Sequence, residues 1–228
     1  MTRIAIIAAM AGELRPLVPG WRRESRNGVD LWLAHRGASV WIAACAGSGS
    51  EAAARAFSEA ERGGAVDAVV SVGWAGALGG EFATGHAYVV SGVVDASTGE
   101  RFAAAGSSGA CLLASSRRVA DRDEKLRLRA VFGADLVDME AAGVARLAGL
   151  RGIPFYGIKG VSDGVGDQLP DFNRFISADG KFGWVRFLFF AMVRPGCWPR
   201  LARMGGNSRR AAQAIRARLL DVIGRFPQ

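Results

Sequence analysis

The stretch Ile4-Ala-Ile-Ile-Ala-Ala-Met10 is an apolar run with no polar residue inside it. Similar segments, nearly free of polar alternation, recur at residues 40–46, 68–73, 87–94 and 155–161. Strands of this kind lie in sheets that are covered on both faces, and helices are the usual covering layers. Helical patterns occupy residues 51–62, 140–150 and 209–225. The sequence therefore predicts an α/β fold, a three-layer α/β/α sandwich with a central mixed sheet.

Length and composition bound the organisation of the chain. It has 228 residues, of which 50% are hydrophobic, which suits one sizeable core and a single domain over residues 1–228. The two histidines, His35 and His86, occur in none of the spacings typical of metal sites. We expect no metal and no cofactor, with phosphate left open as a co-substrate.

The cysteines and the N-terminal segment indicate the cellular compartment of the protein. Cys45, Cys111 and Cys197 are an odd number of widely spaced residues in apolar sequence, which favours buried, reduced thiols in a cytoplasmic protein. Thr2 and Arg3 precede a short apolar run, as in an export signal, but no small-residue cleavage site follows it. The run is therefore interpreted as a first strand.

A glycine motif, Gly47-Ser-Gly49-Ser-Glu-Ala52, follows a predicted strand and precedes a predicted helix. This pattern occurs in dinucleotide-binding folds, which also carry an acidic residue at the carboxyl end of the next strand. Asp67 has the required spacing but lies before its strand, where it cannot reach a ribose. NAD binding is disfavoured, and the glycines are expected to let the backbone approach a ligand closely.

Three acidic residues lie where predicted strands pass into loops or helices: Glu13, Glu140 and Asp163. Carboxylates at the ends of apolar segments are costly unless they bind something, so they indicate a functional site. Structural alternatives stay open for each. Glu13 could cap or pair with the following helix, Glu140 could favour the N-terminus of its own helix, and Asp163 could form an Asx turn.

Several short motifs carry a family resemblance. They are the segment from Ile4 to Glu13, Gly47-Ser-Gly49, Val72-Gly-Trp-Ala-Gly-Ala-Leu78, Val137-Asp-Met-Glu-Ala-Ala142 and Val161-Ser-Asp163. In this order they resemble the nucleoside phosphorylase and methylthioadenosine/S-adenosylhomocysteine nucleosidase superfamily. The resemblance covers roughly residues 4–176, and the Asp-Met-Glu and Ser-Asp motifs together are its most specific part.

The resemblance implies roles for these residues in cleaving an N-glycosidic bond. Asp163 matches the acid that protonates purine N7, held protonated by a desolvating pocket and positioned by Ser162. Glu140 matches the acceptor for the ribose hydroxyls, Met139 packs on the sugar, and Glu13 matches the base that activates water. Further residues expected to bind substrate are Asp138, Ser48, Trp74, Gly76, Lys159 and Phe172.

The chain also departs from the family pattern. Trp74 stands where the family usually has Ser or Thr, and Lys159 where many nucleosidases have Arg. The arginine pair that grips phosphate in phosphorylases has no match near Glu13 or Gly73, which favours water over phosphate as acceptor. Lys159 remains a candidate to hold an anion or the water. Phe172 and Phe175 match the aromatic lid segment.

The C-terminal part differs most. Residues 186–228 hold nine arginines and a single acid, Asp221, so the whole basic excess of the chain lies there. Residues 182–193 are rich in aromatic residues but too short to span a bilayer. Two alternatives stay open for 182–228: a core helix followed by a solvated basic helix, or a peripheral membrane contact through residues 182–210 at the inner face of the membrane. Nucleic-acid binding is disfavoured because no known module is present.

The motifs Pro199-Arg-Leu-Ala-Arg203 and Ser208-Arg-Arg210 resemble the C-terminal extension of the hopanoid-associated branch of this superfamily. That resemblance implies release of adenine from adenosylhopane, a purine nucleoside with an apolar lipid tail. The alternatives are a phosphate-dependent purine nucleoside phosphorylase, a methylthioadenosine/S-adenosylhomocysteine nucleosidase, or a protein that binds nucleoside and lipid without turnover. The family resemblance also implies a homo-oligomer.

Overall fold

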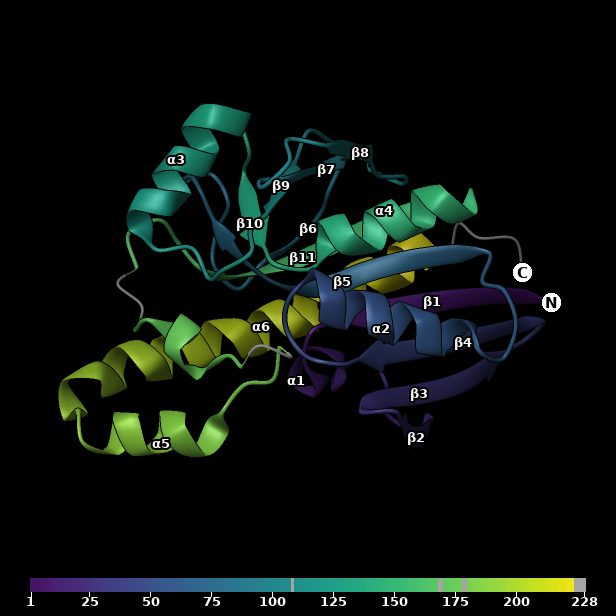
Figure 1. Ribbon diagram of the computed structural model, residues 1–228, viewed down its shortest axis with the longest axis horizontal. Coiled ribbons are helices and arrows are strands. Elements are labelled where there is room, and N and C mark those ends of the chain that lie inside the picture. The colour runs from purple at the N-terminus through teal and green to yellow at the C-terminus, as the bar shows by residue number, and fades with distance from the viewer. Residues whose placement is uncertain (108, 168–169, 178–179, 224–228) are drawn as a thin grey trace.

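The computed structural model describes residues 1–107, 109–167, 170–177 and 180–223 (Figure 1). The strands are β1 Thr2–Ala8, β2 Arg22–Arg26, β3 Val29–Arg36, β4 Ser39–Cys45, β5 Ala68–Ala77, β6 Ala87–Val89, β7 Gly92–Asp95, β8 Arg101–Ala103, β9 Leu112–Ser115, β10 Leu136–Asp138 and β11 Phe155–Asp163. The helices are α1 Ala11–Leu14, α2 Ser50–Glu61, α3 Arg122–Phe132, α4 Ala141–Arg151, α5 Trp184–Met192 and α6 Trp198–Ile223, with short 3-10 turns η1 Phe172–Phe175 and η2 Pro195–Cys197.

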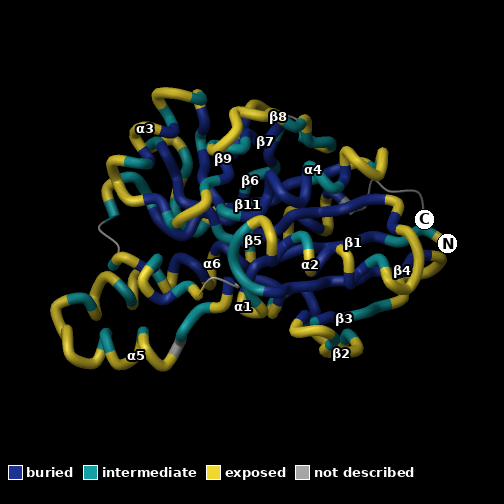
Figure 2. The backbone as a smooth tube through the Cα atoms, in the orientation of Figure 1, coloured by how far each residue is buried: buried dark blue, intermediate teal, exposed yellow. Residues whose placement is uncertain are grey.

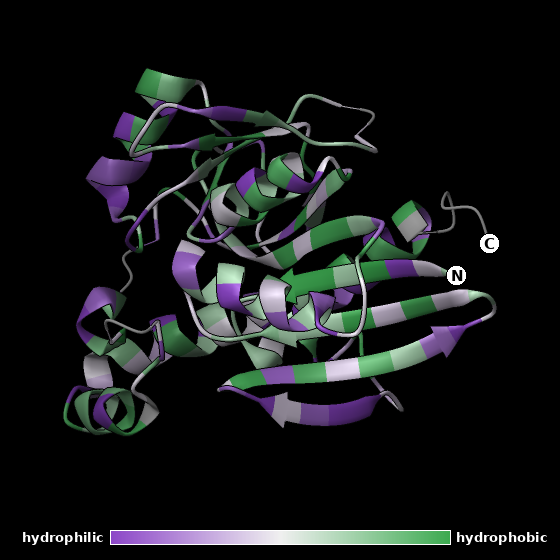
Figure 3. Cartoon of the chain, turned by 45° about the vertical axis from the view of Figure 1, so that its right-hand side comes forward, coloured by the Kyte–Doolittle hydropathy of each residue, from purple (hydrophilic) through white to green (hydrophobic). Residues whose placement is uncertain are grey.

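Within the described residues the strands form one mixed sheet of 11 strands. Its main path runs β2-β3-β4-β1-β5-β10-β9-β7-β8, while β11 pairs with β5 and β6. β1, β4, β5 and β11 pair in parallel, whereas β10 is antiparallel to β5. In Figure 3 the central strands are largely hydrophobic, and the edge strand β2 is hydrophilic. Charged side chains on an edge strand discourage pairing with another chain.

Helices cover both faces of this sheet, so the predicted three-layer fold is confirmed. On one face, α2 and α4 bury alanines and Phe57 against the alternate residues of β1, β4 and β5. On the other, Leu14 of α1 and three residues of α6, Ile215, Leu219 and Val222, pack against the remaining residues of these strands. The second half of α6 is therefore a layer of the sandwich, whereas α5 and the first half of α6 project beyond it (Figure 1).

Central elements agree with their predicted bounds to within a few residues, but three differ in a way that matters. β5 continues to Ala77, beyond the predicted end at residue 73. The segment 87–94 is two strands, because β6 pairs with β11 and β7 pairs with β8 and β9. The helix predicted from residue 209 begins at Trp198, and residues 224–225 of the prediction lie outside the described part.

The register of the strands brings the three predicted acids toward one edge. Glu13 follows the carboxyl end of β1, and Asp163 is the last residue of β11, which is parallel to β1 through β5. Asp163 pairs in register with Gly76 of β5, and β10 meets the same part of β5 through Val137. Glu140 follows two residues after β10 ends.

Across the described ranges, no helix has the length and apolarity needed to cross a bilayer.

Candidate active site

A cavity of about 740 Å³ opens at this edge of the sheet. Its volume falls within the range of about 300–1,000 Å³ that is typical of ligand pockets. Glu13, Glu140 and Asp163 all line it, together with seven of the other residues expected to bind substrate, namely Asp138, Met139, Ser162, Ser48, Trp74, Gly76 and Phe172. The structure thus brings together all the predicted site residues except Lys159.

Glu13 lines this cavity and is only 3% exposed. Its Oε2 accepts hydrogen bonds from the N–H groups of Ala9 and Met10, at 2.9 and 2.8 Å, and its Oε1 accepts one from Trp74 N–H at 2.7 Å. A carboxylate offers about four acceptor positions, so one remains, on Oε1. Burial raises the pKa of Glu13, against the lowering effects of the N–H donors and of Lys159. The carboxylate also caps its own short helix, so the structural alternative for Glu13 holds as well.

Gly73 makes this arrangement possible. Its φ is +149°, and a Cβ placed on it would lie 2.8 Å from Glu13 Oε1. Any larger residue would therefore collide with the carboxylate. The glycine in the middle of β5 is explained by the close approach of the Glu13 side chain to the strand.

Glu140 contacts the glycine-rich loop that precedes α2. Its Oε1 accepts a hydrogen bond from Gly49 N–H at 2.8 Å, and its Oε2 accepts one from Met139 N–H at 3.2 Å. It stands at the N-cap of α4, but its side chain makes no capping hydrogen bond. Burial, with the negative charge of Asp138, raises the pKa of Glu140 to about 8, and Lys159 opposes this shift.

This raised pKa predicts a pH-dependent stability that Glu140→Gln removes. The carboxyl group of Glu140 binds its proton more tightly in the folded protein than in the unfolded chain, where its pKa is 4.5. The resulting stabilisation is complete below pH 4.5 and is lost as the pH rises toward 8. Glutamine carries no charge, so the variant should exceed the wild type in Tm by at least about 3 °C at pH 9. Thermal unfolding from pH 4.5 to 9 measures this, with exposed Glu51→Gln as control; parallel curves for Glu140→Gln and wild type would contradict it.

Asp163 is held between a hydroxyl and an ammonium group. Ser162 Oγ donates to Asp163 Oδ1 at 2.6 Å, as expected for a positioning residue. Lys125 Nζ from α3 forms an ion pair with Asp163 Oδ2 and donates to Gly164 O at 2.8 Å. The carboxyl group is therefore held on both of its oxygens, and the contact with Lys125 is one that the sequence analysis did not predict.

Lys125 is the site residue that the sequence analysis missed. It is 2% exposed and lines the cavity, although its sequence, Arg-Asp-Glu-Lys-Leu-Arg-Leu-Arg, has the character of a solvated helix. The available signal is the helical spacing, because Lys125 and Leu128 are one turn apart and are both buried.

Lys159 does not line the cavity, which corrects its assignment to substrate or anion binding. Its side chain is 1% exposed, its Nζ lies 2.9 Å from Asp138 Oδ2, and it donates to Ser71 Oγ at 2.9 Å. Asp138 Oδ2 also accepts from Ala141 N–H at 3.0 Å, and Ser115 Oγ donates to Oδ1. Asp138 lines the cavity, and these contacts take three of the about four acceptor positions of its carboxylate. The pair therefore supports the turn that carries Met139 and Glu140.

Removing this buried cation is expected to destabilise the fold. Lys159→Met leaves the Asp138 carboxylate buried without its counter-charge, a change that typically costs about 3–5 kcal/mol. The double variant Lys159→Met/Asp138→Asn should recover part of that loss, because no unpaired charge remains. Urea unfolding measures both. A single variant as stable as wild type would show that the pair has no structural role.

Residues 201–213 of α6 contribute one wall of the cavity, which the sequence analysis did not assign. The residues from this helix are Leu201, Met204, Gly205, Ser208, Arg209, Ala212 and Gln213. Trp74 fixes this wall to the sheet, because its Nε1 donates to Ser208 O at 3.0 Å. The residue that departs from the family pattern at position 74 thus ties the C-terminal helix to the site.

Part of the cavity is strongly apolar. Phe172, Phe182 and Phe187 line it beside Leu201 and Met204. Their rings contact one another, with centroids 5.7 Å apart for Phe172 and Phe187 and 5.4 Å for Phe182 and Phe187. Phe175, of the predicted lid segment, contacts Phe187 with ring centroids 5.4 Å apart but does not itself line the cavity.

Three arginines also line the cavity: Arg15, Arg118 and Arg209. They lie on α6 and on loops that follow β9 and α1, which are distant in the chain. All three are exposed overall, so they can meet an anion without the cost of a buried charge.

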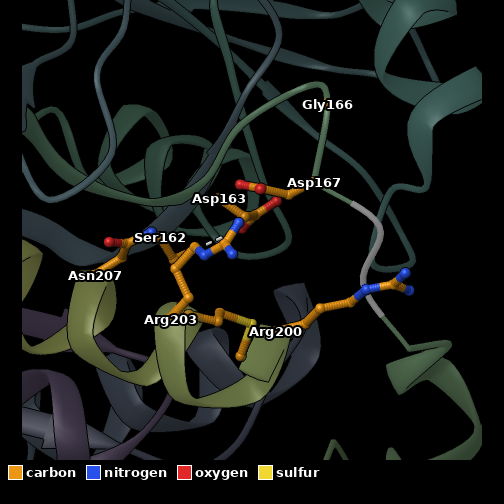
Figure 4. Close-up of a pocket in the computed structure, with 8 residues that line it drawn as sticks. Ser162, Asp163, Gly166, Asp167, Arg200, Arg203 and Asn207 are labelled. Atoms are coloured by element: carbon orange, nitrogen blue, oxygen red, sulfur yellow. Dashed lines mark hydrogen bonds between the residues drawn. The ribbon is translucent and has the colours of Figure 1, made fainter. Parts of the chain in front are cut away.

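A smaller hollow of about 190 Å³ adjoins Asp163 (Figure 4). Arg200 and Arg203 reach it from α6, and Asp167 and Asn207 also line it. Asp167 Oδ2 accepts from Gly164 N–H at 2.8 Å and so shapes the loop that follows Asp163. Ser162, Asp163 and Met204 line both hollows, so the smaller one continues the main cavity.

All three cysteines are free. Burial raises the pKa of the Cys45 and Cys111 thiols to about 12, so both are inert at neutral pH. Cys197 is half-buried, which differs from the expectation of three buried thiols. Among the described residues, no group of three or more His, Cys, Asp or Glu could hold a metal ion.

Comparison with known proteins gives matches in sequence and in fold. Residues 107–180, less than half of the chain, match the sequence model of the Phosphorylase superfamily. Uncharacterized proteins of Mycobacterium bovis and Mycobacterium tuberculosis are 51% identical over 37 residues, a match that covers 16% of this chain and 50% of theirs. The chain therefore spans half the length of the curated relatives it matches.

Solved nucleosidase structures have the same fold. A Helicobacter pylori 5'-methylthioadenosine/S-adenosyl homocysteine nucleosidase aligns with a TM-score of 0.74 at 15% identity, covering 99% of both chains. The futalosine hydrolase of Helicobacter pylori aligns with a TM-score of 0.74 at 15% identity, over 99% of this chain and 98% of its own. The S-adenosylhomocysteine nucleosidase of Streptococcus pyogenes, in complex with 5-methylthiotubericidin, aligns with a TM-score of 0.74 at 17% identity, over 100% and 98%. The superfamily resemblance seen in the sequence is thus supported by the family model and by the fold.

Proposed function

We propose that this protein cleaves the N-glycosidic bond of a 5′-substituted adenine nucleoside and releases adenine. The observation that supports this most is the convergence of Glu13, Glu140 and Asp163 on one cavity. Breaking this bond develops oxocarbenium character on the ribose and negative charge on the leaving purine. Carboxylates near the sugar stabilise the oxocarbenium character of the ribose, and a proton delivered to the base neutralises the negative charge of the leaving purine.

Each group has a position that suits a role. Asp163 gives its proton to purine N7 and is left as a carboxylate beside the Lys125 ammonium, with Ser162 holding the carboxyl group in place. Glu140 accepts from the ribose hydroxyls, next to Met139. Glu13 takes the proton of the attacking water at the remaining acceptor position of its Oε1.

The substrate that we favour has an apolar 5′ substituent, and adenosylhopane fits this description. The aromatic and aliphatic part of the cavity, around Phe172, Phe187 and Met204, provides a surface for such a group. This assignment also rests on the resemblance of the C-terminal motifs to the hopanoid-associated branch. A cytoplasmic location belongs to the same proposal.

Release of adenine tests this function directly. Purified protein is incubated with adenosylhopane and with methylthioadenosine, and free adenine is quantified by chromatography. We expect release from both without phosphate, and faster release from adenosylhopane. Absence of adenine from every 5′-substituted adenosine would remove the proposal.

Phosphorolysis is a second candidate, because Arg15, Arg118 and Arg209 line the cavity. Arginine is well suited to bind phosphate through paired hydrogen bonds. The sugar product distinguishes the two reactions, since hydrolysis yields the 5-substituted ribose and phosphorolysis yields the 1-phosphate of that sugar. A strict requirement for phosphate in the same assay would select the phosphorylase.

A further inference from the structure

Helix α5 is apolar on the side that faces the protein and on the side that faces solvent. Inward, Phe187 and Phe190 pack on Phe175, with ring centroids 5.4 and 5.2 Å apart. Outward, four apolar side chains follow each other with helical spacing; their exposed fractions are 82% for Val185, 59% for Leu188, 66% for Phe189 and 65% for Met192. We call these four residues the outer stripe. Figure 2 shows most of α5 as exposed.

The spacing of the outer stripe makes it one continuous face. Positions i, i+3, i+4 and i+7 lie on the same side of a helix. A helix that is hydrophobic all round is normally buried, and large exposed apolar patches mark surfaces that bind a partner. In the isolated chain the outer stripe is exposed to solvent, so we expect a partner surface, its cover, to bind it.

The surroundings of the outer stripe are positively charged. Arg186, Arg194, Arg200 and Arg203 are exposed on α5, the turn after it and the start of α6. From Lys181 to Leu220 the sequence contains neither Asp nor Glu. The cover is thus expected to be apolar at its centre and negatively charged around it.

A bilayer that contains anionic lipids has both properties. A second copy of the chain fits less well, because a two-fold pairing of this face would bring arginines against arginines. Trp198, next to the outer stripe, is 54% exposed, and its indole N–H donates to Ala191 O at 2.7 Å. An exposed indole ring suits the depth of lipid headgroups, where tryptophan is enriched.

We propose that α5, η2 and the start of α6 form a membrane-docking surface for an anionic bilayer, with α5 lying in the interface. Helices that bury an apolar face at the interface, with basic residues nearby, bind in this way without crossing the membrane. The opposite side of α5 carries Phe187, which lines the cavity. Docking therefore sets the bilayer about one helix diameter, roughly 10 Å, from the cavity.

This position gives the surface a use that rests on the proposed function. A nucleoside whose 5′ substituent is a lipid tail is held in the bilayer, and a cavity lined by the docked helix can take it up with a shorter passage of the tail through water. A short, water-soluble substrate such as methylthioadenosine gains nothing from docking.

Vesicle flotation tests the docking. Full-length protein is mixed with vesicles of phosphatidylcholine alone or with 30% phosphatidylglycerol, and the floated fraction is measured at low and high salt. We expect binding to the anionic vesicles that weakens with salt. Leu188→Ser/Phe189→Ser/Met192→Ser should reduce partitioning at least about tenfold. The control Leu126→Ser/Val131→Ser/Leu150→Ser changes equally apolar exposed residues on α3 and α4 and should bind as wild type.

Charge reversal tests the electrostatic part. Arg186→Glu/Arg194→Glu should reduce binding by about fivefold or more for each arginine, whereas Arg36→Glu/Arg122→Glu, with the same change in net charge, should have a smaller effect. Equal losses in both double variants would indicate binding through net charge only and would overturn the docking surface.

Further outcomes decide whether a bilayer or a second copy of the chain binds the outer stripe. No flotation with either vesicle, or flotation that the triple serine variant retains, would overturn the proposal. So would a dimer in lipid-free solution that the triple variant dissociates, because the cover would then be a second copy. The triple variant should keep the wild-type rate on methylthioadenosine. Vesicle binding without adenine release would instead count against the proposed function and leave the docking surface in place.

Discussion

Asp163→Asn is expected to lower kcat for adenine release by about 10²–10⁴, the usual contribution of a proton-transfer group. Asparagine keeps the size of the side chain, and its carbonyl can still accept from Ser162 Oγ. It cannot carry a proton to the purine, and its amide would face the Lys125 ammonium as a second donor. Steady-state kinetics measures the rate, and equilibrium binding of a nucleoside analogue should change less than about tenfold.

The same variant separates an enzyme from a protein that binds nucleoside without turnover. If the chain only binds, Asp163→Asn has no rate to change and leaves nucleoside affinity as it is. Asp167→Asn is the matched control, because Asp167 lies on the same loop and outside the main cavity. Its amide oxygen can still accept from Gly164 N–H, so activity should stay within a few fold of wild type. A comparable loss in both variants would assign the effect to loop geometry.

The sheet and the three acids could be predicted from the sequence because the signals are local. β1, β4 and the first part of β5 are continuous apolar segments, which only a sheet covered on both faces accommodates. Glu13 follows β1 and Asp163 ends β11, and both strands are parallel to β5, so their carboxyl ends meet at one edge. The convergence of these two acids therefore follows from the strand directions, whereas Glu140 follows β10, which is antiparallel to β5.

Lys125 and Lys159 show where local signals fail. Lys159 interrupts an apolar strand, as an anion-binding residue could, yet it pairs with Asp138 beneath the site. Lys125 lies among charged residues that do face solvent, and only its place on the helix turns it inward. In each case the partner carboxylate is distant in the chain, so the assignment depends on a tertiary contact that spacing does not reveal.

The cavity wall from α6 could not be predicted for a different reason. Pro199 and the pair Gly205-Gly206 argue against a helix before residue 209. Pro199 is nevertheless tolerated, because it lies in the first turn, where its missing N–H has no intrahelical partner. The glycines cost about 1 kcal/mol each relative to alanine, but Gly205 lines the cavity, where a side chain would occupy ligand space.

Glu13→Gln is expected to lower kcat by about 10²–10⁴ as well, but with a different pH signature. As a general base, Glu13 must be ionised, so wild-type kcat/KM should rise with pH as this carboxyl loses its proton, shifted upward by burial. The residual activity of the variant should lack this rise, because an amide does not titrate. A pH–rate profile of both proteins measures the difference.

A structural effect of Glu13→Gln has to be separated from the chemical one. Glutamine has one acceptor oxygen in place of two, so it cannot serve Ala9, Met10 and Trp74 N–H groups together, and some loss of Tm is expected. Glu59→Gln is the matched control, because Glu59 is a buried carboxylate on α2 outside the cavity. Rates are compared at a temperature where circular dichroism shows both variants fully folded. Glu13→Gln could then retain the wild-type kcat and the same rise of kcat/KM on the acidic side of the pH–rate profile. In that case another group must activate the water, and Glu13 serves only to hold the β1–α1 turn against β5.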